Sequence, residues 1–493
     1  MTTERYNRPF ESMSRRQFIR NGLCVAGAAA AFGSGLNIET LLAATGTSGA
    51  GSRSLPNFII VNADDMGYGD LSCYGSTAIR TPNLDKLADE GIRFTDFYAC
   101  NALCSPSRFG LLTGRYPQRA GIQHVFYERQ WSLRLGRLLS KVGGADLKGA
   151  ENEQKGIPED EITLAESLKT VGYQTAIIGK WHLGNFAKKP EYHPMNHGFD
   201  HFLGVPFSNG NNPFPLYRGN TLLEENIQGQ EQGKLTSLYT KETIDFIEKS
   251  RDKPFFCYLA HTFPHQPHFS SENFHLKSDG GKYGDTVEEL DWSMGVIMSC
   301  LKRNKLDENT LVIFTSDNGP WNVGSPGSLR GRKGQIFDGG FRVPMIARQP
   351  GVISAGTISH EPTMNTDFFP TCLAMAGVSL PKGRIIDGRD ITGILRGTDR
   401  DPAEKELLFF HHDMLQGIRV GRWKLYRDIN LYIYPTPVNV IGKRGKGPFL
   451  YDMEKDPGEN YEIGAKYPDL VSKLSIRMDE LAKSMAENQK GLI

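Results

Sequence analysis

Acidic side chains follow two short apolar runs of this 493-residue chain, at the point where each run ends. Asp64 and Asp65 come directly after the run at 58–61, and Asp317 and Asn318 follow a second run. Adjacent carboxylates repel each other and need a compensating cation, and hard oxygen ligands suit Ca²⁺ or Mg²⁺. Either motif alone is more often a turn or a helix cap. The metal-site interpretation therefore depends on both motifs lying at strand ends.

A cysteine stands at the predicted start of a helix. Pro106 suits the first turn of a helix that runs to about Thr113. Cys104 would then lie at the positive N-terminal end, where an anion is stabilised. A lone cysteine is more often a buried, inert thiol. Here, however, the Cys-x-Pro-x-Arg pattern that ends at Arg108 is followed by Leu-Leu-Thr-Gly-Arg at 111–115, which makes it the most specific signal in the chain.

Two further apolar runs end in polar clusters. The run at 175–178 leads into Lys180 and His182, and the run at 255–260 leads into His261 and His265. Continuous apolar runs of this length are typical of strands buried on both faces of a parallel sheet. Because ligands of such sheets bind at the carboxyl ends of the strands, we expect all four clusters to lie at one edge.

Helix signals separate these runs, at 81–91, 163–172 and 285–304. Alternating strands and helices predict an α/β fold with a large, mostly parallel sheet flanked by helices. After about residue 400 the pattern changes to strands of a meander and a closing helix. We therefore predict a smaller C-terminal subdomain with an antiparallel sheet and a helix. Its predicted strands lie at 407–410, 417–426 and 449–451, and its helix at 470–486.

The first fifty residues resemble an export signal. Arg15 and Arg16 precede a weakly apolar, Ala-rich stretch at 22–36, which is typical of twin-arginine export. A basic arm or a short membrane anchor is the alternative. We predict a signal peptide at 1–44, a linker at 45–55, a main domain at 56–400 and the C-terminal subdomain at 401–493. The predicted partner is the twin-arginine translocase, and the predicted location is periplasmic or secreted. The polar segment 130–160 is predicted to be a surface insertion near the site.

Composition excludes several classes of protein. Lys plus Arg number 57 and Asp plus Glu 56, and this near balance argues against general nucleic-acid binding. No apolar run reaches the roughly 20 residues of a membrane-spanning helix, so we expect no stable membrane span after processing. A hydrophobic fraction of 39% excludes wholesale disorder. Seven cysteines are an odd number and form no disulfide framework, although Cys73 and Cys100 could pair.

Five motifs, in order along the chain, resemble those of the type I sulfatase family. The similarity is closest to the arylsulfatase A and N-acetylgalactosamine-6-sulfatase branch, and it extends from about Asn57 to Asp452. The resemblance implies an alkaline-phosphatase-like fold, a catalytic domain at 56–400 and hydrolysis of sulfate monoesters. The motifs are Asp64–Asp70, Cys104–Arg108, Leu112–Arg115, Gly179–Gly184 and Ser316–Gly319.

The same resemblance assigns the site. It implies that a formylglycine-generating or sulfatase-maturing enzyme oxidises Cys104 to Cα-formylglycine. One hydroxyl of the hydrated aldehyde would attack sulfur and the other would later expel sulfate, which divides one hard step into two. The remaining roles are the metal ligands Asp64, Asp65, Asp317 and Asn318 together with residue 104; Arg108 beside the formylglycine; Lys180 and His182 on the sulfate and the diol; His265 on the sulfate and the leaving alcohol; and Lys333 as the second sulfate lysine.

A charge count agrees with this set. Three ionised aspartates and one divalent cation, Ca²⁺ or Mg²⁺, leave one negative charge. Lys180, Lys333 and Arg108 then make the site doubly positive, ready for an anion. The expected substrate is a sulfated carbohydrate, with aryl sulfates as artificial substrates. Two alternatives are a phosphate or phosphonate ester hydrolase on the same scaffold and a non-catalytic relative that binds sulfated glycans.

Other histidines carry weaker hypotheses. His261 and His268 flank His265 and are candidates for lining the pocket. His411 and His412 follow a predicted strand of the small subdomain and are candidates for substrate choice. The triplet at 193, 197 and 201 has metal-like spacing, but Pro194 and Gly198 argue against one helix, so we expect loop residues there.

Overall fold

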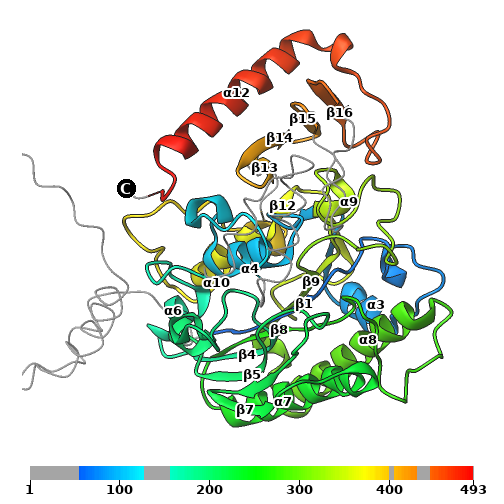
Figure 1. The fold of residues 1–493 in the computed structure, drawn as a ribbon, viewed down its shortest axis with the longest axis vertical. Coiled ribbons are helices and arrows are strands. Elements are labelled where there is room, and N and C mark those ends of the chain that lie inside the picture. The colour runs from blue at the N-terminus through cyan, green and yellow to red at the C-terminus, as the bar shows by residue number, and fades with distance from the viewer. Residues whose placement is uncertain (1–54, 127–155, 399–404, 430–444, 492–493) are drawn as a thin grey trace, which may run out of the picture.

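The computed structural model describes residues 55–126, 156–398, 405–429 and 445–491 (Figure 1). The predicted export signal, all of the predicted linker except Leu55, and most of the predicted insertion lie outside these residues. Within them, a large mixed sheet forms the centre of the molecule. Its ten strands follow the order β11 (Thr357–Ser359), β2 (Ile92–Phe94), β10 (Met345–Arg348), β9 (Thr310–Ser316), β1 (Asn57–Ala63), β8 (Phe255–Ala260), β4 (Gln174–Lys180), β5 (His201–Val205), β6 (Leu216–Arg218) and β7 (Thr221–Glu224).

The four predicted strands are adjacent at the middle of this sheet. β9, β1, β8 and β4 pair in parallel, and all but one of their residues are buried because helices cover both faces. Antiparallel pairing begins on both sides, where β10 joins β9 and where β6 joins β5. The α/β prediction with a mostly parallel sheet is confirmed.

Helices lie on both faces of the sheet (Figure 1). Alternate residues of β1 point to opposite cores: Phe58 and Ile60 pack into one, and Ile59 and Val61 into the other. The first core includes α4 (Cys104–Thr113), α6 (Leu164–Lys169) and α10 (Phe368–Met375), with α11 (Thr392–Leu395) beside them. The second includes α3 (Pro82–Asp89), α7 (Leu235–Ser250) and α8 (Gly281–Arg303).

The sequence signals for helix ends agree with the structure at several points. Thr163 and Glu166 form the predicted capping box at the start of α6. Pro82 opens α3, and Cys104 is the first residue of α4. α8 begins at Gly281, four residues before the predicted start, because Asp285 accepts hydrogen bonds from the preceding loop instead of capping the helix.

The C-terminal part forms a separate antiparallel sheet with a helix packed on it, as predicted. The predicted strand region 417–426 is a hairpin that turns at Gly421, whose φ is +56°. This sheet shares a core with the main domain through Tyr98 and Phe341. Its elements are β13 (Glu406–His411), β14 (Met414–Val420), β15 (Trp423–Tyr426), β16 (Phe449–Asp452) and α12 (Pro468–Glu487), and a short pair, β3 (Phe97–Tyr98) with β12 (Thr363–Met364), lies in the main domain.

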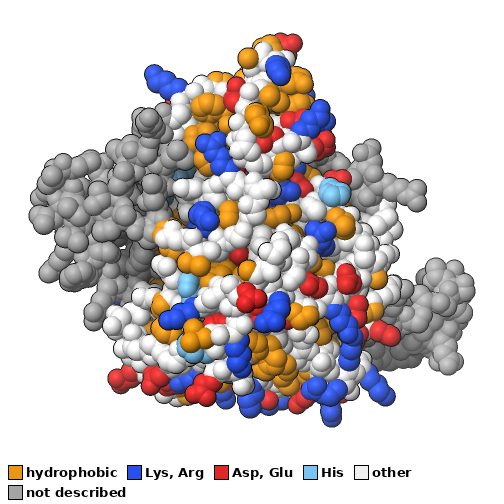
Figure 2. All heavy atoms as spheres, turned by 90° about the vertical axis from the view of Figure 1, so that its right-hand side faces the viewer, with side chains coloured by type: hydrophobic (Ala, Val, Ile, Leu, Met, Phe, Trp, Pro, Cys, Tyr) orange, Lys and Arg blue, Asp and Glu red, His pale blue; other side chains and the backbone are white. Residues whose placement is uncertain are grey.

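Three further findings concern the expectations from composition. In the described part of the chain, no helix combines the length and the apolar character needed to cross a bilayer. Cys73 and Cys100 are both free thiols, so the possible pairing between them is wrong. On the face drawn in Figure 2, basic and acidic side chains alternate without forming one large patch of a single sign.

Candidate active site

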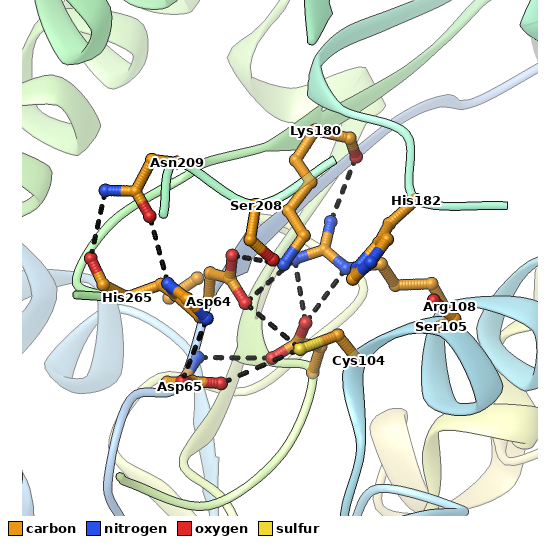
Figure 3. Close-up of polar contacts among 12 residues, drawn as sticks. Asp64, Asp65, Cys104, Ser105, Arg108, Lys180, His182, Ser208, Asn209 and His265 are labelled. Atoms are coloured by element: carbon orange, nitrogen blue, oxygen red, sulfur yellow. Dashed lines mark hydrogen bonds and ion pairs between the residues drawn. The ribbon is translucent and has the colours of Figure 1, made fainter. Parts of the chain in front are cut away.

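The predicted clusters meet at one edge of the main sheet, where four neighbouring parallel strands end (Figure 3). Asp64 and Asp65 follow β1, and Asp317 and Asn318 follow β9. Lys180 ends β4, and His265 lies on the loop after β8. The first residue of α4, Cys104, points into the same space, because α4 runs away from this edge.

Oxygen ligands gather around Cys104. Single ligand atoms of Asp64, Asp65, Asp317 and Cys104 all lie within 4.8 Å of one another, and all four residues are buried. Asn318 adds a buried Oδ1 that has no hydrogen-bond partner among the described residues, while its Nδ2 donates to Asp65 Oδ1 at 2.9 Å. A buried orphan acceptor beside three carboxylates fits a hard divalent cation such as Ca²⁺ or Mg²⁺.

Each aspartate also has a cationic partner. Lys180 Nζ lies 2.6 Å from Asp64 Oδ2, and the Arg108 guanidinium lies 2.8 Å from Asp317 Oδ2. Lys333 Nζ contacts Asp65 Oδ1 and lies 3.1 Å from Cys104 Sγ. These buried pairs leave both lysines beside residue 104, where an incoming anion would meet them.

Burial and neighbouring charges shift the pKa values of Asp64 and Asp317 in opposite directions. Burial raises the pKa of Asp317 to about 6, and the charge of Asp64 adds to this effect. Burial would also raise the pKa of Asp64, but Lys180 and the other positively charged neighbours together outweigh burial and hold that pKa well below its usual range. Two neighbouring carboxyls with such different proton affinities are typical of a functional site.

The thiol of Cys104 is a poor nucleophile in this setting. The residue is 1% exposed, and burial raises its pKa to about 12 despite Lys180 and Lys333. Because the thiolate is the reactive form of cysteine, direct attack by Cys104 at neutral pH is disfavoured. The helix N-terminus and the lysines would instead stabilise an oxygen anion at this position.

Two residues of the site have strained backbones. Asp65 has a φ of +66° and His182 a φ of +58°, in the left-handed region that residues with a side chain rarely adopt. The ring of His182 is 4% exposed, and its Nε2 lies 2.9 Å from the carbonyl oxygen of Phe126. Burial lowers the pKa of His182, with Lys180 and Arg108 adding to the effect. Such strain is stored where the surrounding structure needs a side chain in one place.

A pocket of about 200 Å³ opens over this cluster. Its floor is formed by the predicted residues Asp65, Cys104, His182, His265 and Lys333. Its other lining residues are Val125, Phe126, Ser208, Gly210, Asn211, Gln266 and Trp321.

Comparisons with known proteins agree with this geometry. Residues 56–378 match the model of the Sulfatase family, and residues 332–484 match "N-sulphoglucosamine sulphohydrolase, C-terminal". The chain is 35% identical to N-acetylgalactosamine-6-sulfatase from Canis lupus familiaris, over 93% of this chain and 92% of the relative. It is 36% identical to human arylsulfatase A, over 83% of each chain. The chain belongs to the sulfatase family. It is therefore a sulfuric ester hydrolase.

Solved structures of other proteins share the fold. The PsFucS1 sulfatase from Pseudoalteromonas sp. superposes with a TM-score of 0.76 at 25% identity, covering 98% of this chain and 95% of that one. Ps i-CgsB in complex with k-i-k-neocarrahexaose superposes with a TM-score of 0.72 at 26% identity, covering 87% and 93%.

The structure also shows where the other candidate histidines of this sulfatase lie. His261 is fully buried and His268 packs on Tyr283, and neither lines the pocket. His411 and His412 contact each other, and His412 stacks on His124; neither His411 nor His412 is among the residues that line the pocket. The 193, 197 and 201 triplet does not form one helix, as expected, and the ring nitrogens of the three residues bond to different partners. The expectation of loop residues is wrong for His197, which ends the 3-10 helix η6 (Pro194–His197), and for His201, which begins β5.

The sequence did not predict several lining residues of the sulfatase pocket. Ser208 and Asn211 lie on the loop that follows β5, and Trp321 lies on the loop after β9. These loops carry no periodic pattern, and the only available signal was their position after strands that end at the same edge.

Proposed function

We propose that this sulfatase hydrolyses sulfate monoesters of carbohydrates, with a formylglycine made from Cys104 and one divalent cation, Ca²⁺ or Mg²⁺. The observation that carries this proposal is the position of Cys104, buried among three aspartates and beside Lys333. Hydrolysis of phosphate or phosphonate esters on the same scaffold is the alternative function, and the relative turnover of the two classes of ester distinguishes them.

Residue 104 requires chemical activation. Its thiol is protonated at neutral pH, as its raised pKa indicates. Conversion to the aldehyde removes sulfur and two electrons from the side chain, so it requires a maturation enzyme that supplies the oxidant. The hydrated aldehyde provides a hydroxyl nucleophile at the N-terminus of α4 and a second hydroxyl for release of sulfate.

The surrounding side chains would bind the cation and the sulfate. Asp64, Asp65, Asp317 and Asn318 would hold the cation, which neutralises the carboxylates and polarises the ester oxygens when bound. Lys180, Lys333 and Arg108 supply fixed positive charge around residue 104. Charge that develops on the sulfuryl oxygens would meet these groups without reorganisation.

Two histidines in the pocket would act on the substrate. His265 Nε2 lies 3.7 Å from Asp65 Oδ2 and faces the pocket, so it is placed to bind sulfate and to protonate the leaving alcohol. His182 lines the same pocket, and we assign it, with Lys180, to binding of the sulfate and the diol. All the catalytic groups that the family resemblance assigns are therefore present, which disfavours a non-catalytic relative.

Relatives support a carbohydrate substrate. N-acetylgalactosamine-6-sulfatase is named for a sulfated amino sugar, and Ps i-CgsB was solved with a neocarrahexaose. The paired arginines at 15 and 16 support export through the twin-arginine translocase to the periplasm or beyond. Because that route carries folded proteins, maturation of Cys104 would be complete before export.

Parallel turnover of an aryl sulfate and an aryl phosphate tests the reaction class. We expect hydrolysis of the sulfate to exceed that of the phosphate by at least about 100-fold, and Cys104→Ala to abolish it while the protein stays folded. Faster turnover of the phosphate would favour the alternative function. Wild-type rates in Cys104→Ala would contradict the role of residue 104 in either reaction.

A further inference from the structure

The loop that carries His265 depends on side chains for its position. Pro264 and Pro267 flank the histidine closely, and neither has a backbone N–H to donate. Asn209 bonds to the backbone of this loop: its Nδ2 donates to the carbonyl oxygen of His265 at 3.2 Å and to that of Pro267 at 2.8 Å. One buried amide, 1% exposed, therefore holds the loop at the histidine itself and two residues after it.

The same amide also contacts the ring. His265 Nδ1 lies 2.9 Å from Asn209 Oδ1 and 2.6 Å from the carbonyl oxygen of Gln266 (Figure 3). Both partners are acceptors, because Asn209 Nδ2 faces three oxygens and a flipped amide would place oxygen against oxygen. Nδ1 must therefore carry a proton, and Nε2 is the nitrogen that faces the pocket.

Gln232 fixes the orientation of Asn209 from behind. It lies on the 3-10 helix η7 (Gly229–Lys234) and is 2% exposed. Its Oε1 accepts from Asn209 Nδ2 at 3.2 Å, and its Nε2 donates to the Asn209 carbonyl at 3.1 Å. These reciprocal bonds leave Asn209 one favourable orientation, because any rotation would leave buried polar atoms unpaired.

We propose that Asn209, held by Gln232, is a positioning residue that fixes the tautomer and the ring direction of His265. Nε2 is then the nitrogen that exchanges protons with the substrate, whatever the protonation state of the ring. This inference rests on the proposed function in assigning His265 to the leaving alcohol. Hydrogen-bonded partners of this kind fix the tautomer of a functional histidine in the same way at metal sites.

The first test is spectroscopic and needs no turnover. Long-range proton–nitrogen spectra of protein labelled with ¹⁵N-histidine report which ring nitrogen carries the proton, and His265→Gln assigns the signal among the 12 histidines. We expect a pure Nδ1–H signal in the mature wild-type enzyme and a mixture of tautomers in Asn209→Ala. An unchanged signal in Asn209→Ala would overturn the inference.

The second test compares leaving groups. A 4-nitrophenolate leaves without a proton, whereas a sugar alkoxide needs one. We expect Asn209→Ala to lower kcat about 10- to 100-fold on a sugar sulfate and less than about threefold on 4-nitrophenyl sulfate. Equal losses on both substrates would indicate a merely structural role and would overturn the inference.

Matched variants separate the possible failures. Gln232→Ala should show the same pattern and serves as the second variant if Asn209→Ala does not fold. Gln230→Ala is the control, since Gln230 lies on the same short helix and bonds to Ser270 instead of Asn209. If His265→Ala changes neither substrate, the proposed role of His265 fails, whereas the tautomer spectrum still decides the role of Asn209.

Discussion

Lys180 and Lys333 are paired with different aspartates, and this division matters for catalysis. Lys180 bonds to Asp64, whereas Lys333 bonds to Asp65 and also contacts the Cys104 sulfur. Burial would lower the pKa of Lys333, but Asp65 and the other acidic neighbours together outweigh burial and raise that pKa well above its usual range. Lys333 is therefore positively charged at neutral pH.

Removal of that charge should slow the reaction without unfolding the protein. We expect Lys333→Ala to lower kcat/KM on an aryl sulfate about 100-fold, which corresponds to about 3 kcal/mol of lost transition-state stabilisation. Steady-state kinetics measures the effect, and the exposed Lys282→Ala is the matched control. A loss below about threefold in Lys333→Ala would show that the lysine does not act on the sulfate.

At the scale of elements, α8 carries a carboxyl that opposes folding at high pH. Glu289 is 1% exposed; one of its oxygens accepts from the Ser271 N–H at 3.0 Å, and the other has no hydrogen-bond partner within the described chain. Burial raises the pKa of Glu289 to about 7, above its ordinary value of 4.5. The folded protein therefore binds a proton that the unfolded chain has already released.

The difference in the pKa of Glu289 between the folded and the unfolded protein determines whether the free energy of unfolding rises or falls with pH. Because the folded-state pKa is raised, the stability contributed by Glu289 falls as the pH rises from about 4.5 to about 7 and is constant above that. We expect Glu289→Gln to gain stability relative to wild type over this window, on the order of 2–3 kcal/mol at pH 8.5. Urea unfolding at pH 5 and pH 8.5 measures it, with Glu288→Gln as the control. An equal effect at both pH values would contradict the prediction.

The elements differ in how well the sequence predicts them. β1, β4, β8 and β9 are continuous apolar runs because both faces of the sheet are covered, and such runs are visible without a structure. The three-residue strands β2 and β11 are too short for a pattern to emerge, so the outer strand order could not be predicted.

The residues of the active site also differ in how well the sequence predicts their positions. Its charged residues follow the predicted strands directly, so their convergence follows from the strand order. Asn209 and Trp321 lie on irregular loops, where backbone hydrogen bonds and side-chain packing decide the position of each residue. No local pattern records such long-range contacts, and only the folded chain reveals them.

At the scale of the whole molecule, a buried ion cluster joins the C-terminal sheet to the active-site side of the main domain. Lys424 of β15 is fully buried and contacts Asp338 at the start of α9 (Asp338–Phe341) and Glu459 at 3.2 Å. Figure 1 shows α9 next to the C-terminal sheet. The carbonyl of Gly340 in α9 accepts from the N–H of Gly319, the neighbour of Asn318.

Breaking this cluster should destabilise the entire fold. Lys424→Met leaves two carboxylates buried without their shared cation, and we expect a loss of about 3–5 kcal/mol in the free energy of unfolding. Urea unfolding followed by circular dichroism measures the change, and the exposed Lys455→Met is the control in the same subdomain. A loss similar to that of the control would show that the two sheets are held together by their apolar core alone.

The central claim is that residue 104 acts as an aldehyde and not as a thiol. The most direct measurement is the mass of the peptide that carries Cys104, taken from active protein purified from its own host. We predict a peptide in which the Cys104 side chain has exchanged sulfur for oxygen and lost two hydrogens. Reduction with borohydride should add two hydrogens and give a serine side chain, with parallel loss of aryl sulfate turnover. A fully unmodified thiol in protein that hydrolyses sulfate esters at full rate would contradict the account.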